Sequence, residues 1–365
     1  MALMVYYSMN VFEINSEVMR ENARTLRSKL NPGVKICCVV KANGYSLGDV
    51  FVAKALDDYS DCFAVAHMSE ALRLREAGIE KDIILFGVCE DLAMAEKLNL
   101  TISINSLHEA RNASKNVASI KIHIMVDTGM TRYGISKTQE LETIFKLLKN
   151  NIEGVYTHFA YEEDNMDGIR KQLDRFQPFV DLARKLDPNI MIHAAHAGAA
   201  HYPPAQFDMV RVGKSFYGGY PGYKTAIKYT SNIVAVHDLE AGGKVSYRGL
   251  FVADKPMKVG VVACGYADGV HINFGDKTHV LVDEKPCNIT GRVCMDAFMI
   301  DVTDIETPLG KEVTIVGDLP GITIMEQMDK TGAVTCDFLC GLNFDRANVK
   351  ILHEELGQDP GYCQE

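Results

Sequence analysis

Lys41 is the residue whose surroundings point most directly to chemistry. It follows the apolar run VKICCVV and opens the segment KANGYSLG. A neutral lysine amine is a nucleophile that can form a Schiff base with an aldehyde cofactor or a carbonyl substrate. A lysine beside apolar residues can also pair with a carboxylate, or reach water along its own stem. The run around Lys41 therefore leaves a catalytic and a structural interpretation open.

Further polar and charged residues stand at or just after other apolar runs. They are Asp127, Arg132, Thr157, His158, His193, His196, Arg211, Lys214 and Ser215. For any single one, a misplaced strand end is the simpler interpretation, because burying an unpaired charge is costly. Several of them at the same ends of successive strands would instead share one pocket, which favours a common site.

Three tempting motifs fail on inspection. The GKS at 213–215 lacks the glycine that a phosphate-binding P-loop needs five residues before it, because Asp208 stands there. If 190–198 is a strand, His193 and His196 point to opposite faces and cannot share a metal, so we predict no metal site. A GxSxG elbow is absent from the sequence, which weakens a serine-hydrolase interpretation.

The elements that must position these residues repeat one theme between 34 and 213. Short apolar runs predict buried strands. They cover 34–42, 62–67, 82–87, 101–106, 121–127, 152–160, 190–198 and 207–213. Amphipathic stretches between them, such as 69–78 and 90–99, predict helices. Eight such units fit a closed (β/α)₈ TIM-like barrel, whose working residues lie at the C-terminal strand ends. An open doubly wound sheet is the alternative.

The pattern changes after about residue 226. Strand-like segments separated by turn residues dominate there, apart from one helical stretch at 322–332. We therefore predict a barrel domain over 1–226 and a mostly-β C-terminal domain over 227–365. A strand at about 9–15 precedes the barrel and is a candidate to pair with the second domain.

Composition bounds the class of protein. The chain has 365 residues, 47% apolar and 24% charged, which suits a soluble protein of two domains. It contains no run of the roughly 18 apolar residues that a membrane span needs, and no signal peptide at its start. A net charge of −10 without a basic block argues against nucleic acid and anionic membranes as partners. Ten cysteines without a secretory signal indicate free thiols in a cytoplasmic protein.

Seven segments, in one order along the chain, resemble motifs of the alanine racemase family. They are VVKANGYSLG around Lys41, VDTGMTRYGI (126–135), GVYTHFA (154–160), MVRVGKSFYGG (209–219), VSYRG (245–249), GYADG (265–269) and GRVCMDAFMIDVT (291–303). The resemblance implies an isomerase that uses pyridoxal 5′-phosphate to interconvert L-alanine and D-alanine and so supplies D-alanine. It also implies an N-terminal βα barrel, a C-terminal β domain and a head-to-tail homodimer with two shared active sites.

The resemblance implies four catalytic roles. Lys41 resembles the lysine that binds the cofactor covalently and acts as one of two bases. Tyr247 resembles the second base, which reaches the site from the other subunit. His158 resembles the histidine that polarises this tyrosine, and Arg211 the arginine that faces the pyridine nitrogen. Racemisation takes a proton from one face and returns one to the other, which suits two bases.

Binding roles follow from the same motifs. Tyr45 resembles the tyrosine that hydrogen-bonds the cofactor phosphate, and Gly213 and Lys214 match phosphate-binding backbone positions. Arg132 resembles the arginine near the cofactor hydroxyl. Tyr266 and Met295 resemble residues of the partner subunit near the substrate carboxylate.

The chain departs from the family pattern at a few positions. His196 and Ala197 stand where the family usually has asparagine and a phosphate-binding serine, and Met125 replaces a frequent lysine. Cys336 stands where a pocket tyrosine is usual, so the substrate side is expected to be more open. Alanine racemisation with tolerated drift is one interpretation. Racemisation of serine or another amino acid, a fold-related decarboxylase that uses the same cofactor, and a carrier of the cofactor are the alternatives.

Overall fold

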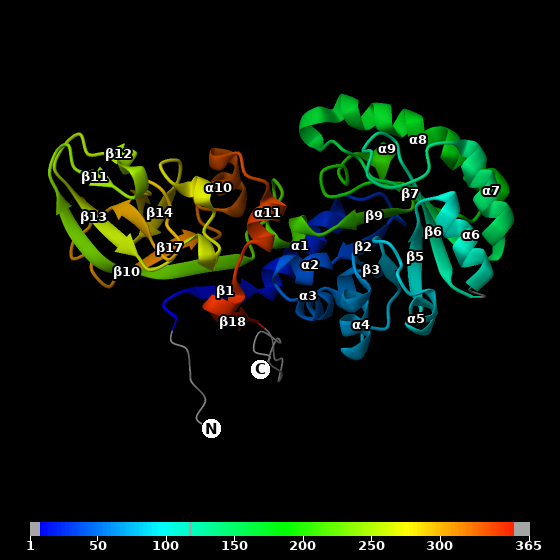
Figure 1. Ribbon diagram of the computed structural model, residues 1–365, viewed down its shortest axis with the longest axis horizontal. Coiled ribbons are helices and arrows are strands. Elements are labelled where there is room, and N and C mark those ends of the chain that lie inside the picture. Colours follow the sequence, from blue (N-terminus) through cyan, green and yellow to red (C-terminus); the bar gives the residue numbers. More distant parts are fainter. Residues whose placement is uncertain (1–7, 117–118, 354–365) are drawn as a thin grey trace, which may run out of the picture. The chain divides into compact units, whose positions relative to one another are not determined.

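Eight parallel strands close into a barrel, as the sequence predicts (Figure 1). Each predicted strand is present, and each is shorter than the apolar run that indicated it. The strands are β2 (Lys35–Val39), β3 (Cys62–Val65), β4 (Ile83–Leu85), β5 (Leu100–Ile104), β6 (Lys121–Val126), β7 (Ile152–Thr157), β8 (Met191–His193) and β9 (Met209–Val212). β2 pairs with β9, which completes the closure and excludes the open sheet.

Helices follow the barrel strands in the order that a βα barrel requires. They are α3 (Asp49–Ala55), α4 (Met68–Glu76), α5 (Leu92–Lys97), α6 (Leu107–Asn116), α7 (Thr138–Leu148), α8 (Met166–Leu186) and α9 (Pro203–Gln206). Figure 1 shows α4 to α8 around the outside of the strands. Because helices cover the outer surface and side chains fill the inside, β3, β4 and β5 are buried at every position. Their continuous apolar runs reflect this double burial.

An eight-stranded sheet combines one strand from the start of the chain with seven strands from its second part. Its strands are β1 (Val11–Asn15), β10 (Ile227–Leu239), β13 (Met257–Val262), β14 (His279–Val282), β15 (Lys285–Asn288), β16 (Phe298–Asp301), β17 (Glu312–Val316) and β18 (Asn348–Leu352). β1 pairs antiparallel with β10 and parallel with β18. Phe12 and Tyr229 lie opposite each other in this register, and their rings stack at 3.9 Å.

Two helices pack with this sheet unit. α10 (Ile324–Thr331) falls within the predicted stretch 322–332, whereas α11 (Thr335–Cys340) was not predicted. A separate ribbon of β11 (Lys244–Val245) and β12 (Phe251–Val252) completes the strands of this part. Helix α1 (Ser16–Ser28) follows β1.

The computed structural model describes residues 8–116 and 119–353, and these form two compact units. The β-rich unit comprises the described residues of 1–22, 45–48 and 214–365. The barrel unit comprises the described residues of 23–44 and 49–213. Within the described ranges, none of the helices combines the length and the hydropathy needed to cross a membrane.

Candidate active site

The segment after β2 carries Lys41 into an unusual turn. Strand β2 ends at Val39, and α2 (Lys41–Tyr45) begins directly at the lysine. The five residues from Ala42 to Ser46 all have positive φ, between 53° and 71°. This left-handed conformation costs roughly 1–2 kcal/mol for each residue other than glycine. Such a run persists only where the surrounding structure holds it, which is typical of functional sites.

Several contacts within the barrel unit hold the turn. The Gly44 N–H donates to the Val40 carbonyl at 2.8 Å, and the Asp49 N–H donates to Asn43 Oδ1 at 3.2 Å. A Cβ on Gly44 would lie 3.1 Å from both Asp49 N and Val52 Cγ2, so this position has little room for a side chain. The Ala42 N–H donates to Glu70 Oε1 at 2.7 Å. Lys41 is thereby fixed at its backbone, while its side chain is half-buried.

Arg211 lies on β9 inside the barrel and is only 4% exposed. Its Nη2 group donates to the carbonyls of Thr157 at 2.8 Å and Ala194 at 2.9 Å, and its Nη1 group donates to His193 Nδ1 at 2.8 Å. Burial lowers the pKa of Arg211 to about 10, so the guanidinium remains charged at neutral pH. The described residues offer it no carboxylate within ion-pair distance.

This guanidinium fixes the protons on three histidines. Because an arginine only donates, His193 Nδ1 must accept and His193 Nε2 carries the proton. His193 Nε2 then donates to His123 Nδ1 at 2.9 Å. His158 Nδ1 also lies 3.2 Å from Arg211 Nη2, whose two hydrogens point to the Thr157 and Ala194 carbonyls. Because a guanidinium has no acceptor, a lone pair of Nδ1 faces it, and His158 carries its proton on Nε2.

The same three rings stay neutral. Burial lowers the pKa of His123 to about 3, and the charge of Arg211 acts in the same direction. Burial also lowers the pKa of His193 and of His158 well below the usual range. At His158 four neighbouring groups that carry or can carry positive charge add to this effect. They are His196, Arg211, Arg132 and Lys41. Arg211 thus contacts a neutral imidazole whose pKa is also lowered by the charges of Arg132 and Lys41.

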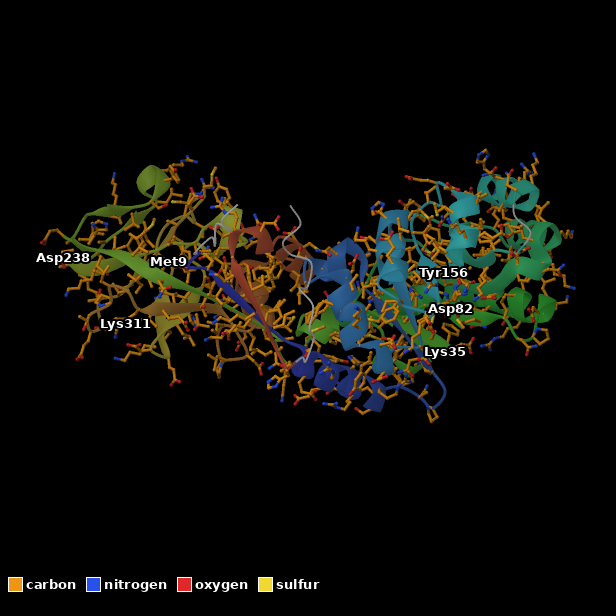
Figure 2. All side chains as sticks on the ribbon, turned by 90° about the horizontal axis from the view of Figure 1, so that it is seen from below. Met9, Lys35, Asp82, Tyr156, Asp238 and Lys311 are labelled. Carbon is orange, nitrogen blue, oxygen red and sulfur yellow. The ribbon has the colours of Figure 1, made fainter. Side chains whose placement is uncertain are left out.

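Tyr156 closes this cluster from β7, where Figure 2 labels it within the barrel unit. Its ring stacks on His193 at 4.7 Å, with an angle of 2° between the planes, and lies 5.3 Å from the Arg211 guanidinium carbon. Its hydroxyl shares a hydrogen bond of 2.8 Å with Ser103 Oγ. The polar layer is therefore fully packed, which keeps the guanidinium in one orientation.

The loop after β6 carries Arg132. Asp127 Oδ1 accepts from the N–H groups of Gly129 and Thr131, and the Ile135 N–H returns to the Met125 carbonyl. A Cβ on Gly134 would lie 2.6 Å from Asp127 N, so the chain can fold back here only with glycine at that position. Arg132 stands exposed on this loop.

In the β-rich unit, Tyr247 lies at the tip of the β11–β12 ribbon. It begins a single helical turn, Tyr247–Gly249, and is 65% exposed. Ser246 Oγ donates to the Arg292 carbonyl at 2.7 Å, and a Cβ on Gly291 would lie 2.9 Å from Ser246 Cβ. The tip is therefore seated on the segment GRVCMD, while the tyrosine ring itself projects outward.

Tyr266 and Met295 are brought together on the same segment. The Tyr266 N–H donates to the Cys294 carbonyl, and the Ala267 N–H to the Met295 carbonyl, both at 3.0 Å. A Cβ on Gly265 would lie 2.2 Å from the Met295 oxygen, so only glycine permits this approach. Both side chains are exposed, at 43% for Tyr266 and 52% for Met295. We call Tyr247, Tyr266 and Met295 the exposed patch.

Three further segments of predicted binding residues meet within the β-rich unit. Ser46 Oγ, one residue after the buried Tyr45, donates to the Cys340 carbonyl at the end of α11. Gly219 lies between Lys214 and α11, because a Cβ there would lie 2.5 Å from Thr335 Cγ2 and 3.0 Å from the Lys214 carbonyl. The half-buried Cys336 lies on that helix. Gly213, directly before Lys214, is buried at the end of β9 in the barrel unit.

One expectation about the histidines is wrong. The predicted strand 190–198 ends at His193, so strand alternation does not govern His196. His196 lies instead in the following turn, where its Nδ1 accepts from the Gly198 N–H at 3.0 Å. Its ring lies 5.0 Å from that of His158. His193 and His196 therefore both lie beside the cluster around Arg211 and His158, rather than on opposite faces.

Two contributors were not predicted from the sequence. Tyr156 carried no signal, because an aromatic residue in a β-rich run is ordinary. Glu70 does carry a sequence signal, because a glutamate at the third position of a helix is typical of an N-terminal capping box. That signal predicts a helix cap and gives no indication of a contact with the turn after Lys41.

The residues present fit pyridoxal 5′-phosphate. The barrel unit offers a buried, permanently charged donor in Arg211 and an amine in Lys41. In the β-rich unit, the Ser215 hydroxyl next to the expected phosphate position Lys214 is buried and has no hydrogen-bond partner among the described residues, as a group that binds a polar ligand would. These donors match a ring nitrogen, an aldehyde and a phosphate.

Comparison with known proteins agrees with both units. Residues 14–221 match the family described as alanine racemase, N-terminal domain, and residues 226–349 match alanine racemase, C-terminal domain. A curated relative, alanine racemase 2 of Caldanaerobacter subterraneus, is 33% identical, with 96% of this chain and 97% of that protein covered. The alanine racemase of Streptococcus uberis is 31% identical and covers 91% of this chain and 95% of its own length.

Solved structures give the same result for the fold. The biosynthetic alanine racemase of Pseudomonas aeruginosa matches with a TM-score of 0.87 at 26% identity, over 94% of this chain and 99% of that one. The alanine racemase of E. faecalis matches with a TM-score of 0.85 at 27% identity, over 96% of this chain and 100% of its own.

Proposed function

This chain belongs to the alanine racemase family, and from that premise we propose how its residues interconvert L-alanine and D-alanine. The protein is an isomerase that depends on pyridoxal 5′-phosphate. The observation that carries the assignment of residues is the contact of the buried Arg211 with the half-buried, neutral ring of His158, whose pKa the charges of Arg132 and Lys41 also lower. A charged donor, an amine and a fixed imidazole in one place are what the reaction needs.

Binding of the cofactor is assigned first. Lys41 holds it covalently, and Tyr45 with the backbone of Gly213 and Lys214 holds its phosphate. Arg211 donates to the ring nitrogen and keeps it unprotonated, because a guanidinium retains its own protons at neutral pH. Arg132 lies near the cofactor hydroxyl in this assignment.

Proton transfer is assigned to two bases. When bound, the cofactor supplies an electron sink that makes the α-proton of an attached amino acid acidic. The Lys41 amine removes or returns this proton on one face, and Tyr247 of the partner subunit does so on the other. His158 carries its proton on Nε2, and we assign that N–H to the oxygen of the partner's Tyr247, where it stabilises the deprotonated phenol. Tyr266 and Met295 of the partner subunit lie near the substrate carboxylate.

A homodimer with two shared sites follows from this assignment. The exposure of Tyr247, Tyr266 and Met295 supports it, because residues that work in a neighbouring subunit must project from their own. We further propose a cytoplasmic enzyme that serves D-alanine biosynthesis, with a boundary near 226 between the barrel domain and the C-terminal domain.

Chiral analysis tests the function directly. The purified protein is supplied with pyridoxal 5′-phosphate and incubated with single L-amino acids in deuterated water. We expect D-alanine as the fastest product, labelled with deuterium at the α-carbon, because racemisation exchanges that hydrogen. Samples without protein serve as the control.

A second substrate is favoured by one observation. Cys336 gives α11 a small side chain where the family usually has a tyrosine, and an apolar pocket rejects an added hydroxyl only weakly. D-serine forming faster than D-alanine would contradict the alanine assignment. A failure to form any D-amino acid would contradict the racemase assignment itself.

A further inference from the structure

Glu70 is a buried carboxylate at the start of α4, and it is only 5% exposed. Its Oε2 accepts from the N–H groups of Ala66 at 2.8 Å and His67 at 3.0 Å. These two bonds cap the helix that Glu70 itself begins. Its Oε1 faces elsewhere and accepts from the Ala42 N–H at 2.7 Å. One carboxylate therefore joins the segment after β3 to the turn after β2.

Other glutamates at helix starts show what a cap alone requires. Glu140 Oε2 accepts from the N–H groups of Ser136 at 3.2 Å and Lys137 at 3.1 Å, which are the same relative positions as Ala66 and His67. Glu109 Oε2 accepts from both the backbone N–H and the side-chain amide of Asn105. Glu326 Oε2 accepts from the Gly321 N–H and from the N–H and hydroxyl of Thr323. Capping thus engages one oxygen in each. Glu70 engages both, and the second oxygen is unnecessary for its helix.

The second oxygen acts on the peptide unit that follows Lys41. The Ala42 N–H lies in one plane with the carbonyl and Cα of Lys41, since the peptide bond is planar. A hydrogen bond to a charged acceptor is about twice as strong as a neutral one. Holding that N–H therefore fixes the direction in which the backbone of Lys41 leaves β2, and with it the origin of the lysine side chain.

The conformation of the turn makes such a restraint necessary. Ala42 has φ 55° and Asn43 φ 53°, which L-residues adopt only at a cost. A turn under this strain relaxes towards ordinary φ values when a restraint is removed. The hydrogen bond from the Ala42 N–H to Glu70 restrains the strained residue that directly follows Lys41.

We propose that Glu70 is a positioning residue for Lys41, whose second carboxylate oxygen holds the left-handed turn that presents the lysine. The inference rests on the proposed function, in which Lys41 binds the cofactor. Glu70 takes no part in proton transfer. Its effect reaches the reaction through the Ala42 N–H alone.

The test compares Glu70→Gln with its matched control Glu140→Gln in the protein loaded with cofactor. A glutamine at 70 has only one oxygen, which can accept either from Ala66 and His67 or from Ala42. Its NH2 group then faces the remaining N–H, which has no acceptor. We expect the Ala42 N–H to lose its partner. Glu140→Gln weakens a helix cap of the same kind and leaves the turn at 42 untouched.

Two readouts separate positioning from capping. Amide hydrogen exchange in the segment 40–46 should become at least about tenfold faster in Glu70→Gln and stay unchanged in Glu140→Gln, since an unpaired N–H exchanges faster. The kcat should fall about tenfold to a hundredfold in Glu70→Gln with a smaller change in KM, because misplacing a reacting group by about 1 Å has effects of this size. Equal behaviour of the two variants in both readouts would overturn the proposal.

Two additions keep the test decisive. If Glu70→Gln is insoluble, Glu70→Asp replaces it, because the shorter side chain cannot span Ala42 and the 66–67 segment together. Reduction of the wild type with borohydride, followed by peptide mapping, identifies the lysine that holds the cofactor. Another lysine in place of Lys41 would refute the proposed function together with this inference. Lys41 found there, with Glu70→Gln matching Glu140→Gln, would refute this inference alone.

Discussion

In the barrel unit Arg211 is buried and hydrogen-bonded to the histidine rings around it, whereas in the β-rich unit the side chains of the exposed patch project into solvent. Arg211 and the three histidine rings of the barrel share hydrogen bonds that fix their protons and orientation. Tyr247, Tyr266 and Met295 instead have exposed side chains on turns that are held by backbone hydrogen bonds and by the Ser246 hydroxyl. The difference teaches that one half of the chemistry is prearranged within a single chain. In the proposed homodimer, the exposed patch would act in the site of the partner subunit.

The largest expected loss of activity in the barrel unit comes from Lys41→Ala. We expect it to abolish both racemase activity and the visible absorption band of the lysine-bound cofactor, because alanine lacks the amine that forms this bond in the proposed assignment. Absorption spectra and activity assays measure both. Lys54→Ala, an exposed lysine on α3, is the control and should keep both. A band that persists in Lys41→Ala would show that another lysine holds the cofactor.

The β-rich half is tested by mixing two inactive variants. Lys41→Ala and Tyr247→Phe should each be inactive alone, and mixed heterodimers should regain on the order of a quarter of the wild-type activity. Half of a random mixture is heterodimer, and each heterodimer holds one intact site. Tyr247→Phe should fold normally because its hydroxyl lies on an exposed ring. Heterodimers confirmed by mass spectrometry but lacking activity would rule out shared sites.

Acid should destabilise the barrel unit, because protonation of its buried histidines favours the unfolded chain. His123 has a pKa of about 3 when folded and near 6.5 when unfolded, so below pH 6.5 only the unfolded chain takes up its proton. The free energy of unfolding should therefore decrease as the pH falls from 6.5 towards 3, by about 1.4 kcal/mol per pH unit for each such histidine.

Urea denaturation between pH 7 and 5 measures this dependence. The slope should be shallower in His123→Gln, and it should be unchanged in His237→Gln, whose histidine is exposed in the β-rich unit. Equal slopes in wild type and His123→Gln would mean that the ring is not neutral and buried as described.

The smallest expected effects concern the phosphate. Ala197→Ser in the barrel unit restores a hydroxyl that the family usually has, and it should tighten cofactor binding about fivefold, the worth of one hydrogen bond of about 1 kcal/mol. Cys336→Tyr does the equivalent in the β-rich unit. Equilibrium dialysis measures the Kd of the cofactor in both. An unchanged Kd in Ala197→Ser would mean that this chain already fills the position by other means.

Much of the barrel followed from its apolar runs, because strands buried on both faces leave a continuous signal. The positions of Lys41, His158 and Arg211 at strand ends followed from the same runs. The orientation of His193 and His196 did not, because it depended on where β8 ends, and periodicity locates ends poorly. Helix α11 was missed because six residues of TCDFLC carry too little periodicity.

The left-handed turn and the role of Glu70 lay beyond sequence reasoning for another reason. A positive φ at Ala42 is set by contacts from α4, not by the preference of alanine. The sequence contains both partners, but the distance of 28 positions between them hides the bond.

The turn from Ala42 to Ser46 also reverses the usual relation between chirality and backbone. A D-residue prefers positive φ as strongly as an L-residue prefers negative φ. D-alanine placed at position 42 by chemical synthesis would therefore fit this backbone without strain and keep its N–H for Glu70. Among genetically encoded residues, glycine, asparagine and aspartate suit positions 42, 43 and 46, whereas valine, isoleucine and threonine are excluded by their branched Cβ. Mutational tolerance here follows handedness rather than size or polarity.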